Sequence, residues 1–445
     1  VKIRLSSPTV DGPYFWTGSS WTTTAGDYLT AEIIGDAGQV GISTWTITTG
    51  LPSLVDGVTY YIVSKAKDLA GNYETSWSTI SFVCDLVGPQ VQIVEPNDTT
   101  PQDYSTPRLS VLTTISGTTT DVGVTQIQKV EYRISRVGLY YWDGEGYSAD
   151  DYNLTDPEAA WFVVQTTVTP QYSLWFITHT FLTDARYMVE VRGVDVLGNY
   201  SVLYSTITFT FDQDVPESVV NYPPNGSIVR TVGQIRGTAN DTGISYPGTV
   251  TQVRIAIRRL SDGKWYDPTA AGGSGDFVQE SFFPIIANLV GNDWWYDISD
   301  SKFTSGTSYY ITAEARDDAY PPNIEQWFHL RSSTFTFDNT PPEVVIQRPP
   351  TTLQYYNQTN LTVISGTAAD ATSEVQTVQI RIQRSSDEKW WIDPDGDGVG
   401  TWAVSGTTEI PCNVASLPTW SYSLANFEAD HAVRYDIWAR AWDVP

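Results

Sequence analysis

The chain contains few cysteines, histidines and basic residues for its length. Its 445 residues include two cysteines and three histidines, and 25 basic residues stand against 51 acidic ones, so the formal net charge is −26. A field of this sign repels nucleic acids and anionic membrane surfaces. No segment approaches the ~18 consecutive apolar residues of a membrane-spanning helix. We therefore expect that the protein binds no nucleic acid and that no part of residues 1–445 inserts into a membrane.

The sequence also lacks the short motifs with which common enzymes hold a nucleophile, a catalytic zinc ion or a phosphate group. It contains no GxSxG, HExxH or CxxC motif and no phosphate-binding glycine loop. The three histidines, His179, His329 and His431, share no surrounding pattern. No pair of carboxylates is singled out by its neighbours for acid–base chemistry. We expect that the protein is not an enzyme.

The most informative feature that is present is an internal repeat. A tyrosine stands eight residues before an aspartate four times, at Tyr60/Asp68, Tyr187/Asp195, Tyr309/Asp317 and Tyr435/Asp443. Successive aspartates are about 125 residues apart. Because a copy of this length can bury its own core, the period predicts a tandem array of domains rather than a solenoid of thin turns.

Each complete copy is expected to contain about seven short strands. Aromatic residues make up 13% of the chain, and apolar residues alternate at Val130-Tyr132-Ile134, Val253-Ile255-Ile257 and Val378-Ile380-Ile382. This alternation is typical of a strand with one face in the core and one in solvent. The patterns predict an all-β fold in which each copy is a two-sheet antiparallel β-sandwich.

The patterns place four repeats at residues 1–86, 87–213, 214–339 and 340–445. The first lacks the first two strands of a complete repeat, and the fourth lacks its last strand. A half sandwich leaves an open core and an unpaired edge. We therefore expect either further chain beyond these residues or a neighbouring copy that supplies the missing strands.

The two cysteines, Cys84 and Cys412, fall in different repeats, so we expect no intrachain disulfide. Cys84 stands where the sister repeats have Phe211 and Phe337. It is predicted to be a small buried apolar residue.

The four repeated tyrosines follow a turn that begins the sixth strand of each sandwich. A tyrosine in this place forms a tyrosine corner, in which its hydroxyl ties the turn to the backbone. The predicted corner residues are Tyr60, Tyr187, Tyr309 and Tyr435. Proline-containing junctions stiffen the links between repeats. With strands of about ten residues per module, the array is expected to be an extended, semi-rigid rod of roughly 130 Å.

The order of these features resembles the tandem bacterial Ig-like (fibronectin-III-like) repeats of large extracellular surface proteins. The resemblance rests on SGTAAD at 365–370, the alternating strand, the tyrosine-to-aspartate frame and FDNTPPEVVI at 337–346, and it covers essentially the whole chain. It implies a tandem array of immunoglobulin-like antiparallel β-sandwiches. Members of this family serve as adhesins, stalks, fibres, surface-layer components and spacers of secreted enzymes, so the resemblance implies no single function. The long aromatic excursions and the segment 316–323 depart from the commoner short repeats.

Aspartates at the junctions between repeats form the first candidate site. In such a sandwich, the loops after the second and sixth strands lie at one end, beside the incoming linker. Carboxylates that converge there would suit Ca²⁺. The three predicted sets are Asp85, Asp121 and Asp195; Asp212 or Asp214 with Asp241 and Asp317; and Asp338, Asp370 and Asp443. Alternatively, each aspartate binds backbone N–H groups of its own turn.

A second candidate is the segment 393–398, where Asp393, Asp395 and Asp397 have the spacing of the first half of an EF-hand loop. The twelfth position is Val404, which cannot supply the bidentate carboxylate. A solvated hairpin tip and a weak Ca²⁺ site are both compatible with this pattern.

The third candidate is a set of aromatic residues in and beside the long hairpins. Neighbouring residues on a strand point to opposite faces, so one ring of each pair is expected to be exposed. The predicted ligand or assembly surface consists of Trp142, Trp265, Tyr266, Trp294, Trp390 and Trp391. These rings could cover the hairpin against its own sandwich, associate with neighbouring copies, or stack on sugars.

Together, these patterns predict a structural, non-enzymatic repeat protein of the cell exterior or cell surface. It would form a semi-rigid rod that associates with neighbouring copies or further repeats into a fibre or surface layer. The alternative is an adhesin or carbohydrate-binding surface module that holds a glycan with its exposed aromatic residues. The only cofactor expected is Ca²⁺ at the domain junctions.

Overall fold

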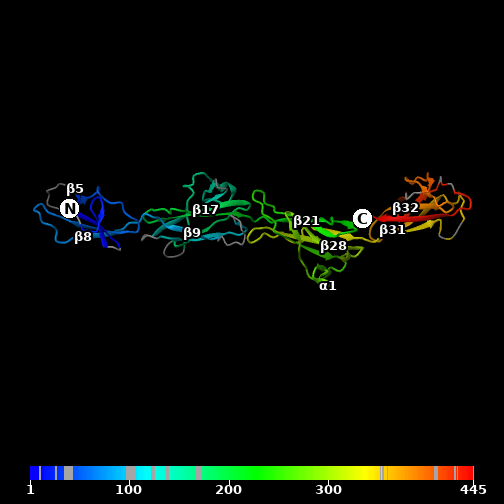
Figure 1. The fold of residues 1–445 in the computed structure, drawn as a ribbon, viewed down its shortest axis with the longest axis horizontal. Coiled ribbons are helices and arrows are strands. Elements are labelled where there is room, and N and C mark those ends of the chain that lie inside the picture. The colour runs from blue at the N-terminus through cyan, green and yellow to red at the C-terminus, as the bar shows by residue number, and fades with distance from the viewer. Residues whose placement is uncertain are drawn as a thin grey trace. The chain divides into compact units, whose positions relative to one another are not determined.

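The computed structural model describes most of the chain and is shown in Figure 1. The described residues are 1–9, 12–25, 28–34, 44–96, 107–121, 126–136, 140–166, 172–350, 352, 355–357, 359–404, 409–424, 427 and 429–443. They form two compact units. Unit 1 contains Val1–Asp214, Gly243–Pro247 and Ala319–Pro321, and unit 2 contains Val215–Thr242, Gly248–Asp318 and Pro322–Pro445.

The regular secondary structure described in unit 1 consists of strands and one 3₁₀ turn at Ala149–Asp151. The strands are β1 (Lys2–Thr9), β2 (Gly12–Trp16), β3 (Trp21–Thr22), β4 (Leu29–Thr30), β5 (Glu32–Ile34), β6 (Thr44–Thr46), β7 (Thr59–Lys65), β8 (Ser78–Val83), β9 (Gln90–Glu95), β10 (Arg108–Leu109), β11 (Thr114–Thr120), β12 (Ile127–Arg136), β13 (Tyr140–Trp142), β14 (Tyr152–Leu154), β15 (Phe162–Val163), β16 (Leu174–Thr178), β17 (Ala185–Asp195) and β18 (Ser205–Phe211).

Unit 2 continues the pattern, and its described residues add the short helix α1 (Ala270–Gly273) and a 3₁₀ turn at Asp300–Lys302. Its strands are β19 (Glu217–Tyr222), β20 (Ser227–Val229), β21 (Gln234–Asn240), β22 (Gln252–Arg259), β23 (Trp265–Asp267), β24 (Asp276–Gln279), β25 (Ile285–Ile286), β26 (Asn288–Val290), β27 (Asp293–Asp297), β28 (Thr307–Arg316), β29 (Ser333–Phe337), β30 (Glu343–Arg348), β31 (Val363–Ala369), β32 (Val375–Arg384), β33 (Trp390–Ile392), β34 (Thr401–Ala403), β35 (Ile410–Pro411), β36 (Asn413–Ser416), β37 (Thr419–Ser423) and β38 (Tyr435–Asp443).

The sheets recur in pairs of one larger and one smaller sheet. Unit 1 has a sheet β3-β2-β1-β7-β8 with the pair β5-β6, followed by β10-β18-β17-β12-β13-β14 with β16-β11-β9. Unit 2 has β20-β29-β28-β22-β23-β24 with β19-β21-β27-β26, followed by β34-β33-β32-β35 with β30-β31-β37-β36. Neighbouring strands are antiparallel, except that β10 and β20 run parallel to β18 and β29. The prediction of an all-β fold of tandem antiparallel sandwiches is confirmed.

Each sheet among the described residues takes its strands from within 2–83, 90–211, 217–337 or 343–443. The repeat boundaries derived from the sequence lie between these spans, and the limits 1–86, 87–213, 214–339 and 340–445 stay a prediction.

In the three later pairs, a core lies between the two sheets. In the first pair, the core cluster of Leu5, Tyr60 and Cys84 contains no residue described in β5 or β6. In the pair that begins with β19, Val220, Ile235 and Trp294 of the smaller sheet pack with Tyr309 and Phe335 of the larger one. The strand that carries SGT or RGT alternates between buried and more exposed residues in β11, β21 and β31. This is the period of two on which the fold prediction depended.

A tryptophan lies on a glycine of the neighbouring strand in three of the smaller sheets. The cross-strand partners are Gly117 and Trp175, Gly237 and Trp294, and Gly366 and Trp420. A Cβ added to any of these glycines would overlap the tryptophan ring and a backbone carbonyl of the strand on its other side. Only glycine fits there, because the ring occupies the space that a side chain would take.

The four repeated tyrosines make the same contact with the backbone. Each hydroxyl accepts a hydrogen bond from the N–H group five residues earlier: Val55 to Tyr60 (2.9 Å), Leu182 to Tyr187 (2.9 Å), Thr304 to Tyr309 (2.8 Å) and Asp430 to Tyr435 (2.8 Å). This is the geometry of a tyrosine corner. The ring therefore fixes the angle at which the chain enters the following strand.

The outer face of β12 differs from the expectation of a solvent-exposed face. Glu131, Arg133 and Ser135 point away from the core and are nevertheless buried. The ring of Trp161 lies over arginines of this face, with the guanidinium groups of Arg192 and Arg133 at 4.0 and 4.6 Å from its centroid. Alternation alone predicted this face wrongly, because a connecting segment brings an aromatic ring across the sheet and excludes water.

Both cysteines are free, and Cys84 is buried beside Leu5 and Tyr60. None of the helices in the described ranges has the length and apolar character needed to cross a bilayer.

Replacing Tyr309 by phenylalanine should lower the free energy of unfolding by about 1–2 kcal/mol, because the N–H group of Thr304 loses its acceptor. Urea unfolding of the whole chain, with amide exchange at Thr304, measures the effect. The matched control is Tyr310→Phe, which changes the neighbouring ring on the other face of β28. Equal losses in the two variants would contradict a special role of the Tyr309 hydroxyl.

Candidate functional site

Carboxylates gather in sets of three at two places where a chain segment enters a sandwich. In unit 1, the set is Asp85, Asp121 and Asp195, and in unit 2 it is Asp338, Asp370 and Asp443. In each set, one carboxylate oxygen per residue lies within 4.8 Å of the others. The structure therefore brings together the members that the sequence placed at these junctions.

The unit 2 set is held by three separate elements. Asp338 follows β29, Asp370 follows β31, and Asp443 ends β38. Oδ1 of Asp338 accepts hydrogen bonds from the Ser305 hydroxyl (2.9 Å) and the Thr340 backbone N–H (3.2 Å). Oδ1 of Asp370 accepts from the backbone N–H groups of Thr372 and Ser373 at 2.7 and 2.9 Å. These bonds fix the direction of each carboxylate.

Two polar atoms of this region are buried without a partner. Oδ2 of Asp338 and Oγ of Ser373 accept or donate no hydrogen bond among the described residues, although Asp338 is only 3% exposed. Burial would raise the pKa of Asp338, but nearby hydroxyls of Ser373, Ser305 and Thr340 outweigh it and hold the pKa below its usual range. Asp338 is therefore a carboxylate; the nearby Ser373 hydroxyl favours its charged form, but Oδ2 makes no hydrogen bond of ordinary geometry among the described residues.

The electrostatic cost of this arrangement is considerable. Two carboxylates at such a separation repel by roughly 3 kcal/mol at an effective dielectric constant of ~20. Within the described part of the chain, none of Asp338, Asp370 and Asp443 forms an ion pair. A cation among the three would remove this repulsion.

In the unit 1 set, Asp195 is largely occupied by its own turn. Its Oδ1 accepts from the N–H groups of Leu197 and Asn199, and its Oδ2 accepts from Nδ2 of Asn199 at 2.7 Å. The same Nδ2 also donates to the backbone carbonyl of Asp85. Here the alternative prediction, an aspartate bound to its own turn, describes most of the side chain.

The asparagine partners were missed from the sequence. Asp68 receives two hydrogen bonds from Asn72, and Asp317 receives two from Asn323, as Asp195 does from Asn199. The signal was present, because an asparagine recurs four or six residues after the framed aspartate. Even the longer segment 316–323 ends in this asparagine, so its extra residues are accommodated within the turn.

The remaining predicted junction residues are divided between the units. Asp212 and Asp214 belong to unit 1, whereas Asp241 and Asp317 belong to unit 2. Asp212 forms an ion pair with Arg108 at 2.8 Å, and Oδ2 of Asp214 accepts from the Thr183 hydroxyl at 3.1 Å.

The hairpin carboxylates also gather, but one of them is a structural residue. Asp393, Asp395 and Asp397 form a third set. Asp393 is fully buried and accepts from the N–H groups of Gly396 and Gly398 and from the Tyr422 hydroxyl. Asp393 and the charge of Asp397 raise the pKa of Asp395. The first aspartate of the loop therefore stabilises the turn, and its oxygens are not free to bind a metal ion.

The prediction that the hairpin aromatic residues form an exposed surface is wrong for five of the six. Exposed fractions are at most 8% for the buried members, which are Trp142, Trp265, Tyr266, Trp294 and Trp391. They complete cores or cover sheets, because the hairpins fold back onto their own sandwiches. Trp390 is partly exposed and packs against Trp438, with ring centroids 5.5 Å apart.

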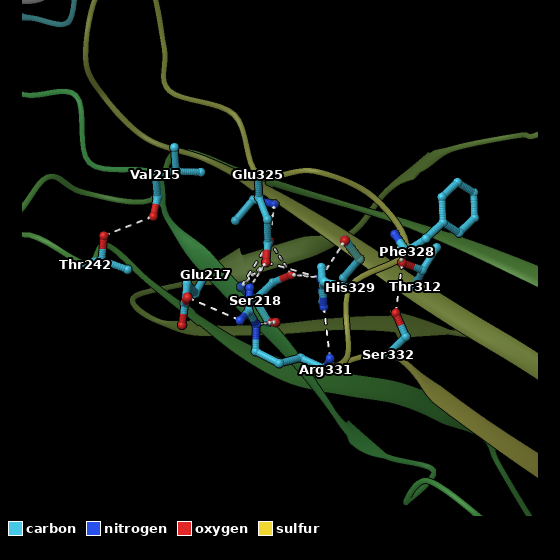
Figure 2. Close-up of polar contacts among 12 residues, drawn as sticks. Val215, Glu217, Ser218, Thr242, Thr312, Glu325, Phe328, His329, Arg331 and Ser332 are labelled. Carbon is cyan, nitrogen blue, oxygen red and sulfur yellow. Dashed lines mark hydrogen bonds and ion pairs between the residues drawn. The ribbon is translucent and has the colours of Figure 1, made fainter.

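One buried cluster contains a serine, a histidine and a glutamate, the residue types of a hydrolytic triad (Figure 2). Ser218 of β19 lies between Glu325 and His329. Its hydroxyl donates to Oε2 of Glu325 at 2.6 Å and lies 3.4 Å from Nε2 of His329. Glu325 also accepts from the backbone N–H groups of Ser218 and Ala315 and pairs with Arg331 at 2.8 Å.

The hydrogen-bond roles in this cluster do not fit nucleophilic catalysis. A catalytic histidine takes the serine proton and is oriented by the acid. Here the serine donates to the acid directly, and Nδ1 of His329 accepts from the backbone N–H of Arg331. Ser218 is also 0% exposed. The cluster instead joins β19 to β28, because the carboxylate of Glu325 accepts hydrogen bonds from backbone N–H groups of both strands.

No family model and no curated protein matches the chain. Among solved structures, it is similar to the FN1–FN3 domains of chicken CNTN1, with 12% identity, a TM-score of 0.24, and coverage of 80% of this chain and 93% of that one. It is also similar to the fibronectin(III)-like modules of Clostridium thermocellum CbhA, with 15% identity, a TM-score of 0.24, and coverage of 60% and 98%. A third likeness is to domains MG0-NIE-MG1 of Escherichia coli alpha-2-macroglobulin, with 9% identity, a TM-score of 0.20, and coverage of 77% and 96%.

At these identities and TM-scores the likenesses carry no argument about function. The sheet pairs and tyrosine corners carry the fold assignment. At the level of the fold, the resemblance to Ig-like (fibronectin-III-like) repeats is confirmed.

Replacing Glu325 by glutamine should lower the free energy of unfolding by roughly 1–3 kcal/mol, because it removes the charge that holds Arg331 and one acceptor of a buried network. The matched control is Glu217→Gln, which removes the solvent-exposed partner of the same arginine and should cost less than ~1 kcal/mol. Denaturant midpoints measure both values. A larger loss in the control would show that the buried cluster is not the stabilising one.

His179 gives unit 1 a pH dependence. It is buried among Trp142, Tyr147 and Phe181, and its Nε2 lies 2.7 Å from the Tyr152 hydroxyl. Burial lowers its pKa to about 4. Since the folded state resists protonation, the unfolded state binds more protons between pH 6.5 and about 4.

The stability that His179 contributes is therefore complete above about pH 6.5 and is lost as the pH falls toward 4. The loss is about 3 kcal/mol at most. We expect His179→Phe to flatten the pH dependence of the unfolding midpoint in this window, and His431→Gln, at an exposed position, to leave it unchanged. An unchanged slope in His179→Phe would contradict the assignment.

Proposed function

We propose that the chain is a structural, non-enzymatic repeat protein of the cell exterior, whose sandwiches form a semi-rigid rod that associates with further copies. The observation that supports this most directly is that chemically notable residues recur from copy to copy in the same structural contact. The four tyrosine corners, the aspartate–asparagine turns and the tryptophan–glycine contacts all bind the chain to itself. An active site would instead be special to one copy.

The rod can be tested by small-angle X-ray scattering of the whole chain. A compact protein of this length has a radius of gyration of about 22 Å. A rod of roughly 130 Å has one of about 38 Å. We expect the larger value. A value near the smaller one would reject the rod while leaving the sandwich fold intact.

Association into a fibre or surface layer is tested by sedimentation velocity and negative-stain electron microscopy over a range of protein concentrations. We expect larger species that grow with concentration without any added ligand. High salt should favour them, because it screens repulsion between chains of net charge −26. A chain that stays monomeric at every concentration and salt level would remove assembly from the proposal.

One observation favours the second candidate, a carbohydrate-binding module, at a place the sequence did not indicate. A hollow of about 520 Å³ in unit 1 is lined by Lys2, Tyr28, Lys65, Tyr73 and Trp77. Tyr28 and Trp77 are stacked with ring centroids 5.1 Å apart, and Nζ of Lys65 lies 4.4 Å from the Trp77 centroid. Aromatic rings with two lysines would suit a sugar that carries a carboxylate.

Titration with a glucuronate oligosaccharide, followed by tryptophan fluorescence, tests this candidate. Binding that is lost in Trp77→Ala and kept in Trp438→Ala, an exposed tryptophan of unit 2, would support it. Absence of any response to the oligosaccharide would leave the structural function alone.

A further inference from the structure

The unit 2 carboxylate set has the features of a cation site, beyond the structural function proposed above. Its side-chain donors are oxygen atoms, from Asp338, Asp370, Asp443 and the neighbouring Ser373. Zinc sites are usually built with nitrogen or sulfur ligands. Mg²⁺ keeps several waters and is bound through one or two carboxylates, whereas Ca²⁺ accepts many protein oxygens in flexible geometry. The donor set therefore fits Ca²⁺ best.

A second observation separates this set from an ordinary group of surface acids. Oδ2 of Asp338 is buried and has no hydrogen-bond partner in the described residues, and the same holds for Oγ of Ser373. Folded proteins rarely leave a charged buried oxygen unpaired. A bound ion is one of the few partners that satisfies both a carboxylate oxygen and a hydroxyl oxygen.

The positions of the three aspartates recur in unit 1. Asp85 and Asp338 come after the last strand of one sheet pair, Asp121 and Asp370 follow β11 and β31, and Asp195 and Asp443 end β17 and β38. In unit 1, however, Nδ2 of Asn199 occupies Oδ2 of Asp195. In unit 2, the buried Oδ2 of Asp338 has no hydrogen-bond partner among the described residues.

We propose that Asp338, Asp370 and Asp443, together with the hydroxyl of Ser373, bind one Ca²⁺ ion that ties the segment after β29 to the turn after β31 and the end of β38. The ion neutralises three carboxylates that otherwise repel each other. Because it binds only when these elements are folded together, it stabilises the sandwich that begins with β30. The site does not depend on whether the chain forms a rod or a fibre.

The test uses the full chain, freed of metal with a chelator and titrated with CaCl₂ by isothermal calorimetry, alongside thermal unfolding. Ca²⁺ should raise the midpoint of one thermal transition by at least ~4 °C. MgCl₂ at the same concentration should have a much smaller effect. A thermal profile that is identical with Ca²⁺ and with chelator would overturn the proposal.

Two variants test whether the ion binds at this position. Asp338→Asn keeps the Oδ1 acceptor for Ser305 and Thr340 but removes the unpaired charged oxygen. Asp370→Asn keeps the acceptor for the N–H groups of Thr372 and Ser373. Each should bind one Ca²⁺ fewer than the unchanged chain and lose the calcium-dependent shift. The calcium-dependent shift of each variant is measured against its own metal-free midpoint, so that a change in basal stability does not enter the comparison.

The controls separate this site from general charge effects and from the hairpin. Glu374→Gln removes a charge from an exposed residue next to Ser373 and should leave the number of bound ions unchanged. Asp395→Asn removes a carboxylate of the hairpin set and should keep the calcium-dependent thermal shift. If Asp338→Asn binds as many ions as the unchanged chain, or if Glu374→Gln loses an ion as well, the assignment is wrong.

Discussion

The contact between a tryptophan ring and a glycine on the neighbouring strand sets the inner face of the smaller sheets. Trp294 can lie flat over β21 only because Gly237 has no side chain, and Trp175 and Trp420 lie in the same way over Gly117 and Gly366. The large ring supplies much of the apolar surface that a thin sandwich can bury. It also fixes the pairing register, because a shift by one residue would turn the ring to the other face.

Buried polar groups stabilise the turns that connect the strands. A two-sheet sandwich must turn its chain many times, and each turn leaves backbone N–H groups that need acceptors. The tyrosine hydroxyls, the framed aspartates and Glu325 are such acceptors. Acidic residues are therefore abundant in this protein partly because carboxylates satisfy several N–H groups at once. Residue types typical of chemistry, such as the Ser218, Glu325 and His329 group, here serve connections between strands (Figure 2).

The carboxylate sets differ in how many of their oxygens already accept hydrogen bonds. Where an asparagine follows the framed aspartate, its side-chain amide shares the negative charge and leaves less for a cation. Where Asp338 keeps a buried oxygen without a partner, the charge remains available. The partners that a carboxylate oxygen already has therefore decide whether its charge is available to a cation.

The sequence by itself determined the all-β fold, the internal period, the tyrosine corners and the membership of two of the three junction aspartate sets. These follow from local patterns, namely alternation with a period of two and turn residues at a fixed spacing. Only the tertiary structure decided which face of an aromatic pair is exposed, because Trp265, Trp294 and Trp391 are covered by segments distant in the sequence. It also decided which carboxylate oxygens are already satisfied, since their partners, such as Arg108 for Asp212, lie far away along the chain. Burial and pairing depend on long-range packing, which periodicity does not record.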